Sequence, residues 1–531
     1  MRRALLLLGI LAPLHAASVF NVIDFGAHRD ASAPSTNAFR AAIQAAKAAG
    51  GGTVYVPPGN YVSGPIELVS NLVLQIDAGA TIRFPAARLP YTWGRQQSVE
   101  AMTPLPLIGG SNLENVTIAG RGVLASDNAD WMKLMPRQKG SGSDPGSANG
   151  PNWERLLQLL EVKTPASEED YLKAAPELRP SFIRAMDSRN VLIEGLHFMG
   201  SPMWTIHLLY SQNVVVRDVI IETYPGVHTD GIAVDSTRDV RISNCYIDTG
   251  DDGIVIKSGK DADGLRVNRP SENISIDNCT VHRAHGAVTL GSETSGWIRN
   301  LVASNITCDG TQMGVRIKSR RGRGGGVEDV RFANWTMRNV GQAINITNFY
   351  IMEGETHSGE EPVSKRTPVF RNIAVSGMNI SGARVAVSVE GLPEMPISGL
   401  RISDVVASAQ TGVKAYNTVD LELHNVQVNP EDGPAFAIRE SKELELDGVS
   451  ARQIAAGAPV IRLDRCPGAI VRNSRAFPGT GTFLSTGPDE LKTVVLQGNT
   501  LANAKKAAEE SSKNFWQEAE PATEGEPERK H

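Results

Sequence analysis

The stretch NVLIEGLHF at residues 190–198 is one copy of the unit from which this chain is built. A polar corner residue begins it, an alternating apolar run follows, and a second corner of Asn, Asp or Gly leads into another apolar run. Strong copies are NVVVRDVII from Asn213, DVRISNCYI from Asp239, NISIDNCTV from Asn273, NLVASNITC from Asn300 and DVRFANWTM from Asp329. Weaker copies begin at Asn372, Gly399, Asp420 and Glu443. Such internal repetition predicts a solenoid.

The spacing of the copies indicates which kind of solenoid. Start-to-start intervals range from 23 residues (213−190) to 34 residues (273−239), which is too irregular for helical repeats of fixed length. A parallel β-helix tolerates such variation because its turns differ in length without disturbing the stack of strands. The alternation directs one set of side chains inward, and Asn and Gly supply the left-handed backbone of tight corners. We therefore predict an all-β, single-stranded parallel β-helix.

The N-terminal residues resemble a secretory signal. Arg2 and Arg3 precede an apolar run at residues 4–14, and small residues follow at Ala16 and Ala17, so we expect residues 1–17 to be removed on export. No later apolar run approaches the roughly 20 residues that a membrane-spanning helix requires. We expect an exported protein, periplasmic or extracellular, with no membrane span.

The rest of the chain divides around the repeats. Residues 36–52, TNAFRAAIQAAKAAGGG, predict an amphipathic helix that caps the open N-terminal end of the solenoid. We expect the β-helix catalytic domain at residues 18–502, with a non-repetitive insertion at about 126–180. The charged segment 503–531 has few apolar residues and is expected to be disordered.

Composition excludes several classes of function. The net charge of −5 and the lack of a basic tract give no electrostatic case for nucleic-acid binding. The chain has four cysteines, which are Cys245, Cys279, Cys308 and Cys466. The first three come late in the repeat, where a small apolar side chain faces the core, so free buried thiols are expected. The sequence contains no close C-x-x-C pair, so the cysteines do not indicate a metal site. We expect no cofactor and a monomeric protein.

Four polar clusters interrupt the apolar repeats between residues 228 and 318. They are His228-Thr229-Asp230, Gly250-Asp251-Asp252, Ala284-His285-Gly286 and Arg316-Ile317-Lys318. Equivalent positions on successive coils are roughly 4.8 Å apart, and Asp251 and His285 each fall 12 residues after the start of a repeat (251−239 and 285−273). We therefore expect these clusters to meet on one side of the solenoid. Taken alone, a paired Asp is typical of a turn, and Arg316 and Lys318 are typical of a strand face exposed to solvent.

The clusters resemble the motifs of the polygalacturonases of glycoside hydrolase family 28. That family has, in order, Asn-x-Asp, a paired Asp, Gly-His-Gly and Arg-x-Lys, and the likeness extends from NVIDFGA near Asn21 through the last clear repeats. It implies a right-handed parallel β-helix and inverting hydrolysis of α-1,4-linked galacturonic acid without a metal. His228 stands where the family usually has Asn, which bears on the sugar bound on the non-reducing side.

Inverting hydrolysis of an acetal assigns a role to each candidate. One protonated carboxyl protonates the leaving oxygen, and an ionised carboxylate accepts a proton from water. We expect Asp251 to be the acid, as the resemblance also implies, with Asp230 and Asp252 activating water and His285 holding Asp251. Separation of acid and base by roughly 6.5–9.5 Å is expected for inversion.

Substrate-binding residues complete the predicted site. Arg316 and Lys318 flank Ile317 in a strand, so both face one side and are expected to bind the uronate carboxylate. His228 and Glu293, in GSETSG at residues 291–296, are further candidates for substrate contact. The insertion at about 126–180 favours an exo-acting enzyme, although neutral loop growth also explains an insertion. The segments KSGKDADG at residues 257–264 and GSETSG at residues 291–296 resemble those of exo-acting members of the family, and this resemblance implies the same.

Three alternative functions stay open. The substrate of a hydrolase on this scaffold is plain polygalacturonate or a modified pectin such as rhamnogalacturonan or xylogalacturonan. A calcium-dependent pectate lyase would recruit a basic Arg or Lys and release unsaturated products. A non-catalytic carbohydrate-binding β-helix would need no carboxylate cluster.

Overall fold

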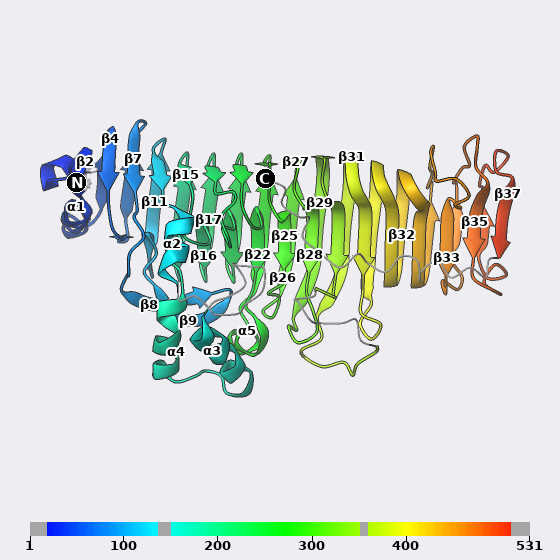
Figure 1. Cartoon of the computed structure of the whole chain (residues 1–531), viewed down its shortest axis with the longest axis horizontal. Helices are drawn as coiled ribbons and strands as arrows, with labels where there is room; N and C mark the ends of the chain where they lie inside the picture. Colours follow the sequence, from blue (N-terminus) through cyan, green and yellow to red (C-terminus); the bar gives the residue numbers. More distant parts are fainter. Residues whose placement is uncertain (1–17, 136–149, 351–358, 511–531) are drawn as a thin grey trace, which may run out of the picture. The chain divides into compact units, whose positions relative to one another are not determined.

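The computed structural model describes residues 18–135, 150–350 and 359–510. The expected signal segment at residues 1–17 lies outside these ranges. The chain divides into two compact units, Met1–Leu301 and Val302–His531, which are described separately. Within each unit, short strands of successive coils pair in parallel (Figure 1). The predicted all-β parallel β-helix is confirmed.

Each coil of the first unit contains up to three strands. The first strand recurs as β1 (Val19–Asn21), β3 (Gly52–Val56), β6 (Leu72–Ile76), β11 (Glu114–Gly120), β14 (Arg189–Glu194), β17 (Gln212–Arg217), β20 (Arg238–Ser243) and β23 (Ser271–Asp277). The second recurs as β2 (Asp30–Pro34), β4 (Gly59–Val62), β7 (Ala80–Arg83), β12 (Val123–Ala125), β15 (His197–Met199), β18 (Ile220–Glu222), β21 (Tyr246–Asp248) and β24 (Thr280–Val281). The third recurs as β5 (Ile66–Glu67), β10 (Ile108–Ser111), β13 (Ile183–Met186), β16 (Ile206–Leu209), β19 (Ile232–Asp235), β22 (Ile254–Lys257) and β25 (Gly286–Gly291). The boundary between the units falls in β26 (Ile298–Ser304).

The corner residues of the repeat explain why the coils stack in register. Asn190, Asn213 and Asn273 all have left-handed backbone, with φ of 58°, 52° and 59°. The Asn213 side chain donates to the Asn190 Oδ1 at 2.7 Å, and Asn190 donates to the Asn115 Oδ1 at 2.8 Å. Asn tolerates this conformation better than most residues, and its amide both donates and accepts. One residue type therefore supplies the turn and links it to the next coil.

A helix closes the N-terminal end of the first unit, as predicted. After the short 3₁₀ helix η1 (Val22–Phe25), helix α1 runs over Thr36–Ala48 and packs against β1, β3, β5 and β6. Its buried face contains Phe39, Ala42 and Ile43. Figure 1 shows α1 at the end of the stack, where it covers apolar side chains that no further coil would bury.

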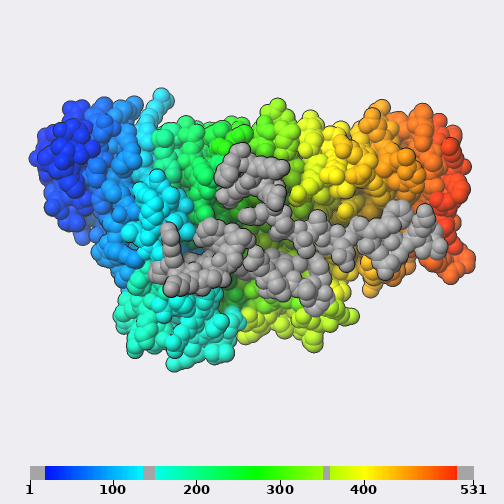
Figure 2. Space-filling view, in the orientation of Figure 1, coloured from blue at the N-terminus to red at the C-terminus, as the bar shows by residue number. Residues whose placement is uncertain are grey.

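The insertion in the first unit is helical. It contains α2 (Asn128–Leu134), α3 (Pro151–Val162), α4 (Glu168–Ala174) and η2 (Ala175–Glu177), and the short helix α5 (Asp261–Val267) comes later in the chain. Figure 2 shows the described part of this insertion as a cyan to teal bulge on the first unit. Its Pro- and Gly-rich segment at residues 136–149 lies outside the described residues.

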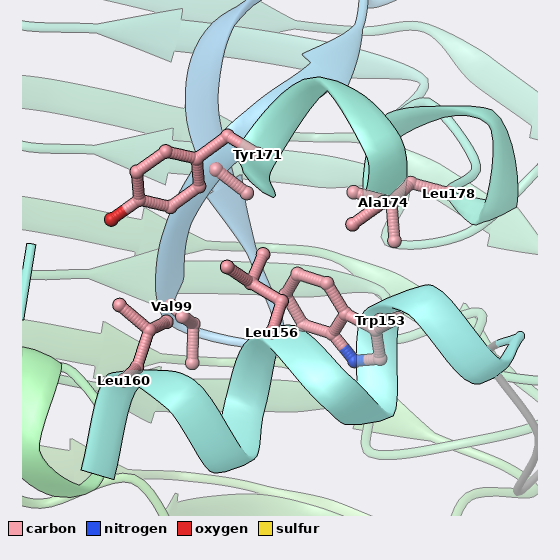
Figure 3. Close-up of a cluster of buried hydrophobic side chains, with 8 residues drawn as sticks. Val99, Trp153, Leu156, Leu160, Tyr171, Ala174 and Leu178 are labelled. Carbon is pink, nitrogen blue, oxygen red and sulfur yellow. The ribbon is translucent and has the colours of Figure 1, made fainter. Parts of the chain in front are cut away.

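Sequence reasoning missed a second insertion, the antiparallel hairpin of β8 (Tyr91–Gln96) and β9 (Val99–Pro104). The hairpin and the helical insertion share a small core, drawn in Figure 3. The buried members of that core are Val99, Ala101, Trp153, Leu156, Leu160, Tyr171, Ala174 and Leu178. Loss of a buried aromatic costs about 3–5 kcal/mol, so this core holds the two insertions together as one layer.

The second unit continues the same architecture with longer strands. Its strands are β27 (Thr307–Asp309), β28 (Met313–Lys318), β29 (Gly326–Arg338), β30 (Gln342–Thr347), β31 (Val369–Glu390), β32 (Ile397–Asp447), β33 (Ile461–Asp464), β34 (Ile470–Arg472), β35 (Thr482–Thr486), β36 (Val495–Gln497) and β37 (Lys506–Glu510). Strand β37 pairs with β35. The β-helix therefore continues past the boundary expected at 502, because β37 adds a further strand to the stack. The remaining tail, 511–531, lies outside the described residues.

Two further expectations concern the core and the membrane. Cys245, Cys279, Cys308 and Cys466 are all buried free thiols, as predicted from their places in the repeat. Among the described residues, every helix is too short or too polar to cross a bilayer.

Candidate active site

Three neighbouring strands of the first unit bring the predicted catalytic residues together. Asp230 precedes β19, Asp252 precedes β22 and His285 precedes β25. The pairing of Ile232 with Ile254 places Asp230 opposite Asp252. The pairing of β22 with β25 continues the same way, so that His285 lies opposite Asp251, and the His285 N–H donates to the Asp251 carbonyl at 3.0 Å. The predicted column of Asp251 and His285 is therefore present.

The three carboxylates form a compact cluster. One oxygen from each of Asp230, Asp251 and Asp252 lies within 4.8 Å of the others. Asp230 and Asp252 are only 2% and 1% exposed, whereas 20% of the Asp251 side chain is exposed. Carboxylates this close raise one another's proton affinity. The cluster therefore favours holding a proton, and Asp251 is the member that is most open to a ligand.

Hydrogen bonds give the members of the cluster different surroundings. The Thr289 hydroxyl donates to the Asp252 Oδ1 at 2.8 Å. The Asp252 N–H donates to the Asp251 Oδ1 at 2.8 Å, and the His285 Nδ1 lies 3.2 Å from the same oxygen. One Asp251 oxygen thus receives two polar contacts from the protein. The geometry orients Asp251, which is what a proton donor requires.

His228 contacts the end of the helical insertion. Its backbone is left-handed, with φ of 55°, and the Arg179 Nη2 lies 3.0 Å from its Nδ1. Arg179 also donates to the carbonyls of Pro202 and Val227 at 2.7 and 3.0 Å. Burial lowers the pKa of Arg179 to about 10, although the Asp251 charge acts in the opposite direction. The buried guanidinium of Arg179 therefore contacts His228 and also interacts electrostatically with the Asp251 carboxylate.

Asn128, at the start of α2, fixes the same loop from another side. Its amide nitrogen donates to the carbonyls of Ser201, Pro202 and Val227 at 3.1 to 3.2 Å. Its oxygen accepts from the Val227 N–H at 3.1 Å. The insertion thus contributes to the site through Asn128 and Arg179, and neither residue was singled out from the sequence.

Sequence reasoning included Lys257 in the segment KSGKDADG but gave it no catalytic or binding role, although it closes the otherwise apolar strand β22. Its Nζ lies 2.9 Å from the Glu293 Oε2 and 3.9 Å from the Asp230 Oδ2, and it stacks on the Trp204 ring at 4.9 Å. Burial lowers the pKa of Lys257, but the charges of Glu293, Asp230 and Asp252 outweigh burial and raise it. A charged residue at the end of a buried strand was the signal in the sequence. Glu293, expected to contact substrate, binds this lysine.

The predicted uronate-binding pair belongs to the second unit. Arg316 and Lys318 lie on β28, and each is 6% exposed. Their cationic groups lie over the same Tyr350 ring, at 5.6 and 4.9 Å from its centroid. Ile317 between them is fully buried. The two cations therefore share one face of the strand, as the alternation predicts, and Tyr350 supports both.

The carboxylate cluster has a resident cation. Oxygens within 4.8 Å of one another satisfy the spacing that a metal ion would require. The ammonium of Lys257, 3.9 Å from Asp230, already supplies positive charge at this place. The cluster therefore combines three carboxylates at a metal-compatible spacing with an ammonium beside one of them.

The hairpin contacts the end of β19, the strand that follows Asp230. The Arg95 Nη1 donates to the Asp235 Oδ1 at 2.7 Å, and both side chains are fully buried. His207, Ala233 and Val255, which point outward on β16, β19 and β22, are fully buried as well. On a bare β-helix these side chains would face solvent. Met203 and Trp204 pack on Ala233 and Val255, so the turn before β16 covers these outward side chains.

Comparison with known proteins places this fold and cluster in a class. The family model "Glycosyl hydrolases family 28" matches residues 168–445, and a "Rhamnogalacturonase A/epimerase, pectate lyase-like" model matches residues 19–88. A "Probable polygalacturonase" of Vitis vinifera is 30% identical over 404 residues, covering 74% of each chain. The protein is a parallel β-helix glycoside hydrolase, and it belongs to glycosyl hydrolases family 28.

Exo-acting relatives are among the similar proteins. An "Exo-poly-alpha-D-galacturonosidase" of Dickeya chrysanthemi is 27% identical over 354 residues, which cover 62% of this chain and 57% of that relative. The structure of an exopolygalacturonase from Thermotoga maritima has a TM-score of 0.70 and 34% identity, covering 78% of this chain and 92% of the other. A family 28 exopolygalacturonase of Yersinia enterocolitica, at 22% identity and a TM-score of 0.65, shares the fold over 82% of this chain and 78% of the other.

Proposed function

We propose that the protein is an exported enzyme that hydrolyses α-1,4 linkages between galacturonic acid units of polygalacturonate, from a chain end and with inversion. The observation that carries the proposal is the cluster of Asp230, Asp251 and Asp252, with one oxygen of each within 4.8 Å of the others. Asp251 is the acid, because it is the most exposed of the three and is oriented by His285. Asp230 and Asp252 accept the proton of the attacking water.

A uronate substrate fits the cationic residues of the second unit. The guanidinium of Arg316 can bind a carboxylate through two hydrogen bonds, and Lys318 adds a point charge beside it. Their shared Tyr350 ring restrains both side chains. We assign this pair to recognition of the sugar carboxylate.

The nearest oxygens of the carboxylates are closer than the separation expected for inversion. That expectation was roughly 6.5–9.5 Å, whereas one oxygen from each group lies within 4.8 Å of the others. Asp230 and Asp252 can still hold one attacking water between them, but the close approach of Asp251 departs from that expectation. The proposal of inversion therefore rests on membership of the family and not on this distance.

Action from a chain end is supported by the two insertions. The hairpin is bound at the end of β19 through the buried Arg95–Asp235 pair, and the helical insertion contacts the turn before β19 through Arg179 and Asn128. An enzyme that cuts inside a polymer needs room for the chain on both sides of the cleaved bond. The likeness to exo-acting relatives supports the same proposal.

Product analysis on polygalacturonate, with a chelator present, tests the function. Saturated galacturonate monomer or dimer is the expected first product. Products that absorb in the ultraviolet and vanish with the chelator would indicate a calcium-dependent lyase instead. Activity on rhamnogalacturonan or xylogalacturonan alone would redirect the substrate assignment, and binding without turnover of any pectic polymer would favour a non-catalytic β-helix.

A further inference from the structure

Lys257 is a buried cation whose contacts lie beside the catalytic cluster. It is the last residue of β22, and only 8% of its side chain is exposed. Its ammonium is 2.9 Å from the Glu293 carboxylate and 3.9 Å from that of Asp230. The cost of burying an ammonium is large unless it is paired, and these carboxylates provide the pairing.

The contacts of Lys257 are unequal among the three aspartates. The lysine's charge interacts with Asp230 and Asp252, whereas Asp251 has His285 at 3.2 Å and is more exposed to solvent. A cation favours the ionised form of the carboxylates nearest to it. When the cluster holds one proton, this asymmetry disfavours placing it on Asp230 or Asp252.

We propose that Lys257 is a positioning residue that keeps Asp230 and Asp252 ionised and leaves the proton of the cluster on Asp251, and that Glu293 limits this effect by binding the ammonium of Lys257. The inference rests on the proposed hydrolase function, in which Asp251 donates that proton to the leaving oxygen. Lys257 acts through the carboxylates and does not need to touch the sugar. Glu293 acts through Lys257, because its bond at 2.9 Å draws the ammonium away from Asp230.

Other charged groups surround this pair and must stay constant in any test. Within the described part of the first unit they come from the insertion, the neighbouring turns and the preceding strand. They are Arg179, His228, Asp230, Asp235, Asp251, Asp252 and His285. None of them is altered by a substitution at residue 257 or 293. Differences between such variants therefore report the pair itself.

The pH dependence of kcat/KM tests this pair, because substitutions of Lys257 and Glu293 should move the acidic limb of the profile in opposite directions. An ionised base is required at low pH, so the acidic limb of the profile reports how readily Asp230 and Asp252 ionise. Removing a cation at this distance raises the pKa of a carboxylate by about 1–3 units. Lys257→Met should therefore move the acidic limb upward by about 1–3 pH units and lower kcat. Glu293→Gln should move the limb downward, and Lys257→Arg should retain most of the wild-type profile.

A matched control is Arg371, a cation of the second unit whose Nη2 lies 2.6 Å from the Glu328 carboxylate. Arg371→Met removes an ion pair without altering a charge beside Lys257, so it should not move the acidic limb. Folded, active Lys257→Met and Glu293→Gln proteins with unmoved limbs would overturn the inference. If Lys257→Met does not fold, the profiles of Glu293→Gln and Lys257→Arg decide it. Failure of the wild-type protein to cleave polygalacturonate would instead contradict the proposed function.

Discussion

His285 lies directly opposite Asp251 on the next coil and contacts it twice. Its backbone N–H donates to the Asp251 carbonyl at 3.0 Å, and its Nδ1 is 3.2 Å from the Asp251 Oδ1. The backbone contact belongs to the coil stack, and the side-chain contact fixes the carboxyl. The stacking of the coils therefore positions the Asp251 side chain, because any change in the register of β22 and β25 would separate Asp251 from His285.

Asp251→Asn should lower kcat at least a hundredfold, and so should Asp252→Asn. Proton transfer by a positioned side chain is worth about 10²–10⁴-fold, and an amide cannot supply it. Asp239→Asn is the matched control, because Asn already occupies the equivalent corner at residues 190, 213 and 273. Steady-state kinetics on polygalacturonate, with circular dichroism to confirm folding, measure the effect. Near-normal turnover by a folded Asp251→Asn protein would remove Asp251 from the role of acid.

The first sugar released should have the inverted, β anomeric configuration. Single displacement by water at the anomeric carbon inverts its configuration, whereas two displacements retain it. Proton NMR of the earliest products, recorded before mutarotation, distinguishes the two. One oxygen of each carboxylate lies within 4.8 Å of the others, which is closer than expected for inversion. The anomeric configuration of the product therefore tests inversion more directly than the carboxylate spacing does. An α product at early times would require a covalent intermediate and contradict the mechanism.

Arg316→Ala and Lys318→Ala should each reduce kcat/KM on galacturonate oligomers by about ten- to a hundredfold. Loss of one hydrogen bond to a charged group usually costs about 1.5–3 kcal/mol. Arg401→Ala is a suitable control, since Arg401 is on the same unit with 57% of its side chain exposed. Wild-type kcat/KM in both test variants would point to a neutral sugar in place of a uronate.

The buried His207 should make the protein less stable as pH falls below neutrality. Burial lowers the pKa of His207, although the adjacent Asp235 acts in the opposite direction. In the unfolded chain an ordinary histidine takes up a proton near pH 6.5, and the folded protein resists this until lower pH. The stabilising contribution is therefore complete above pH about 6.5 and is lost as pH falls toward the lower folded pKa.

Thermal unfolding between pH 7.5 and 5 measures this effect. Tm should fall with pH in the wild-type protein and fall less steeply in His207→Gln. Since carboxylates also contribute to the slope, the difference between the two proteins is the relevant quantity. Identical slopes in the two proteins would show that His207 does not titrate on unfolding.

The scaffold could be predicted from the sequence because each coil of a β-helix has its own local pattern of strands and turns. Each corner Asn marks a turn and a link to the next coil, so the repeat that includes Asn213 can be read without knowledge of distant contacts. The column of Asp251 and His285 followed from the same count. Arg179 and Arg95 could not be found this way. Their partners, His228 and Asp235, are 49 and 140 residues away and are reached through insertions outside the repeat.

The enzyme should shorten polygalacturonate from its ends. The helical insertion contacts the turn before β19 through Arg179 and Asn128, and the hairpin is bound at the end of β19 through the buried Arg95–Asp235 pair. A polymer that extended across these contacts would have to displace both insertions and break that pair. Removal of terminal units releases reducing sugar while the average chain length hardly changes. Viscosity should therefore fall slowly relative to reducing-end release, with monomer or dimer as the first product. A steep loss of viscosity at a few per cent hydrolysis would show internal cleavage and mean that the insertions leave the polymer's path open.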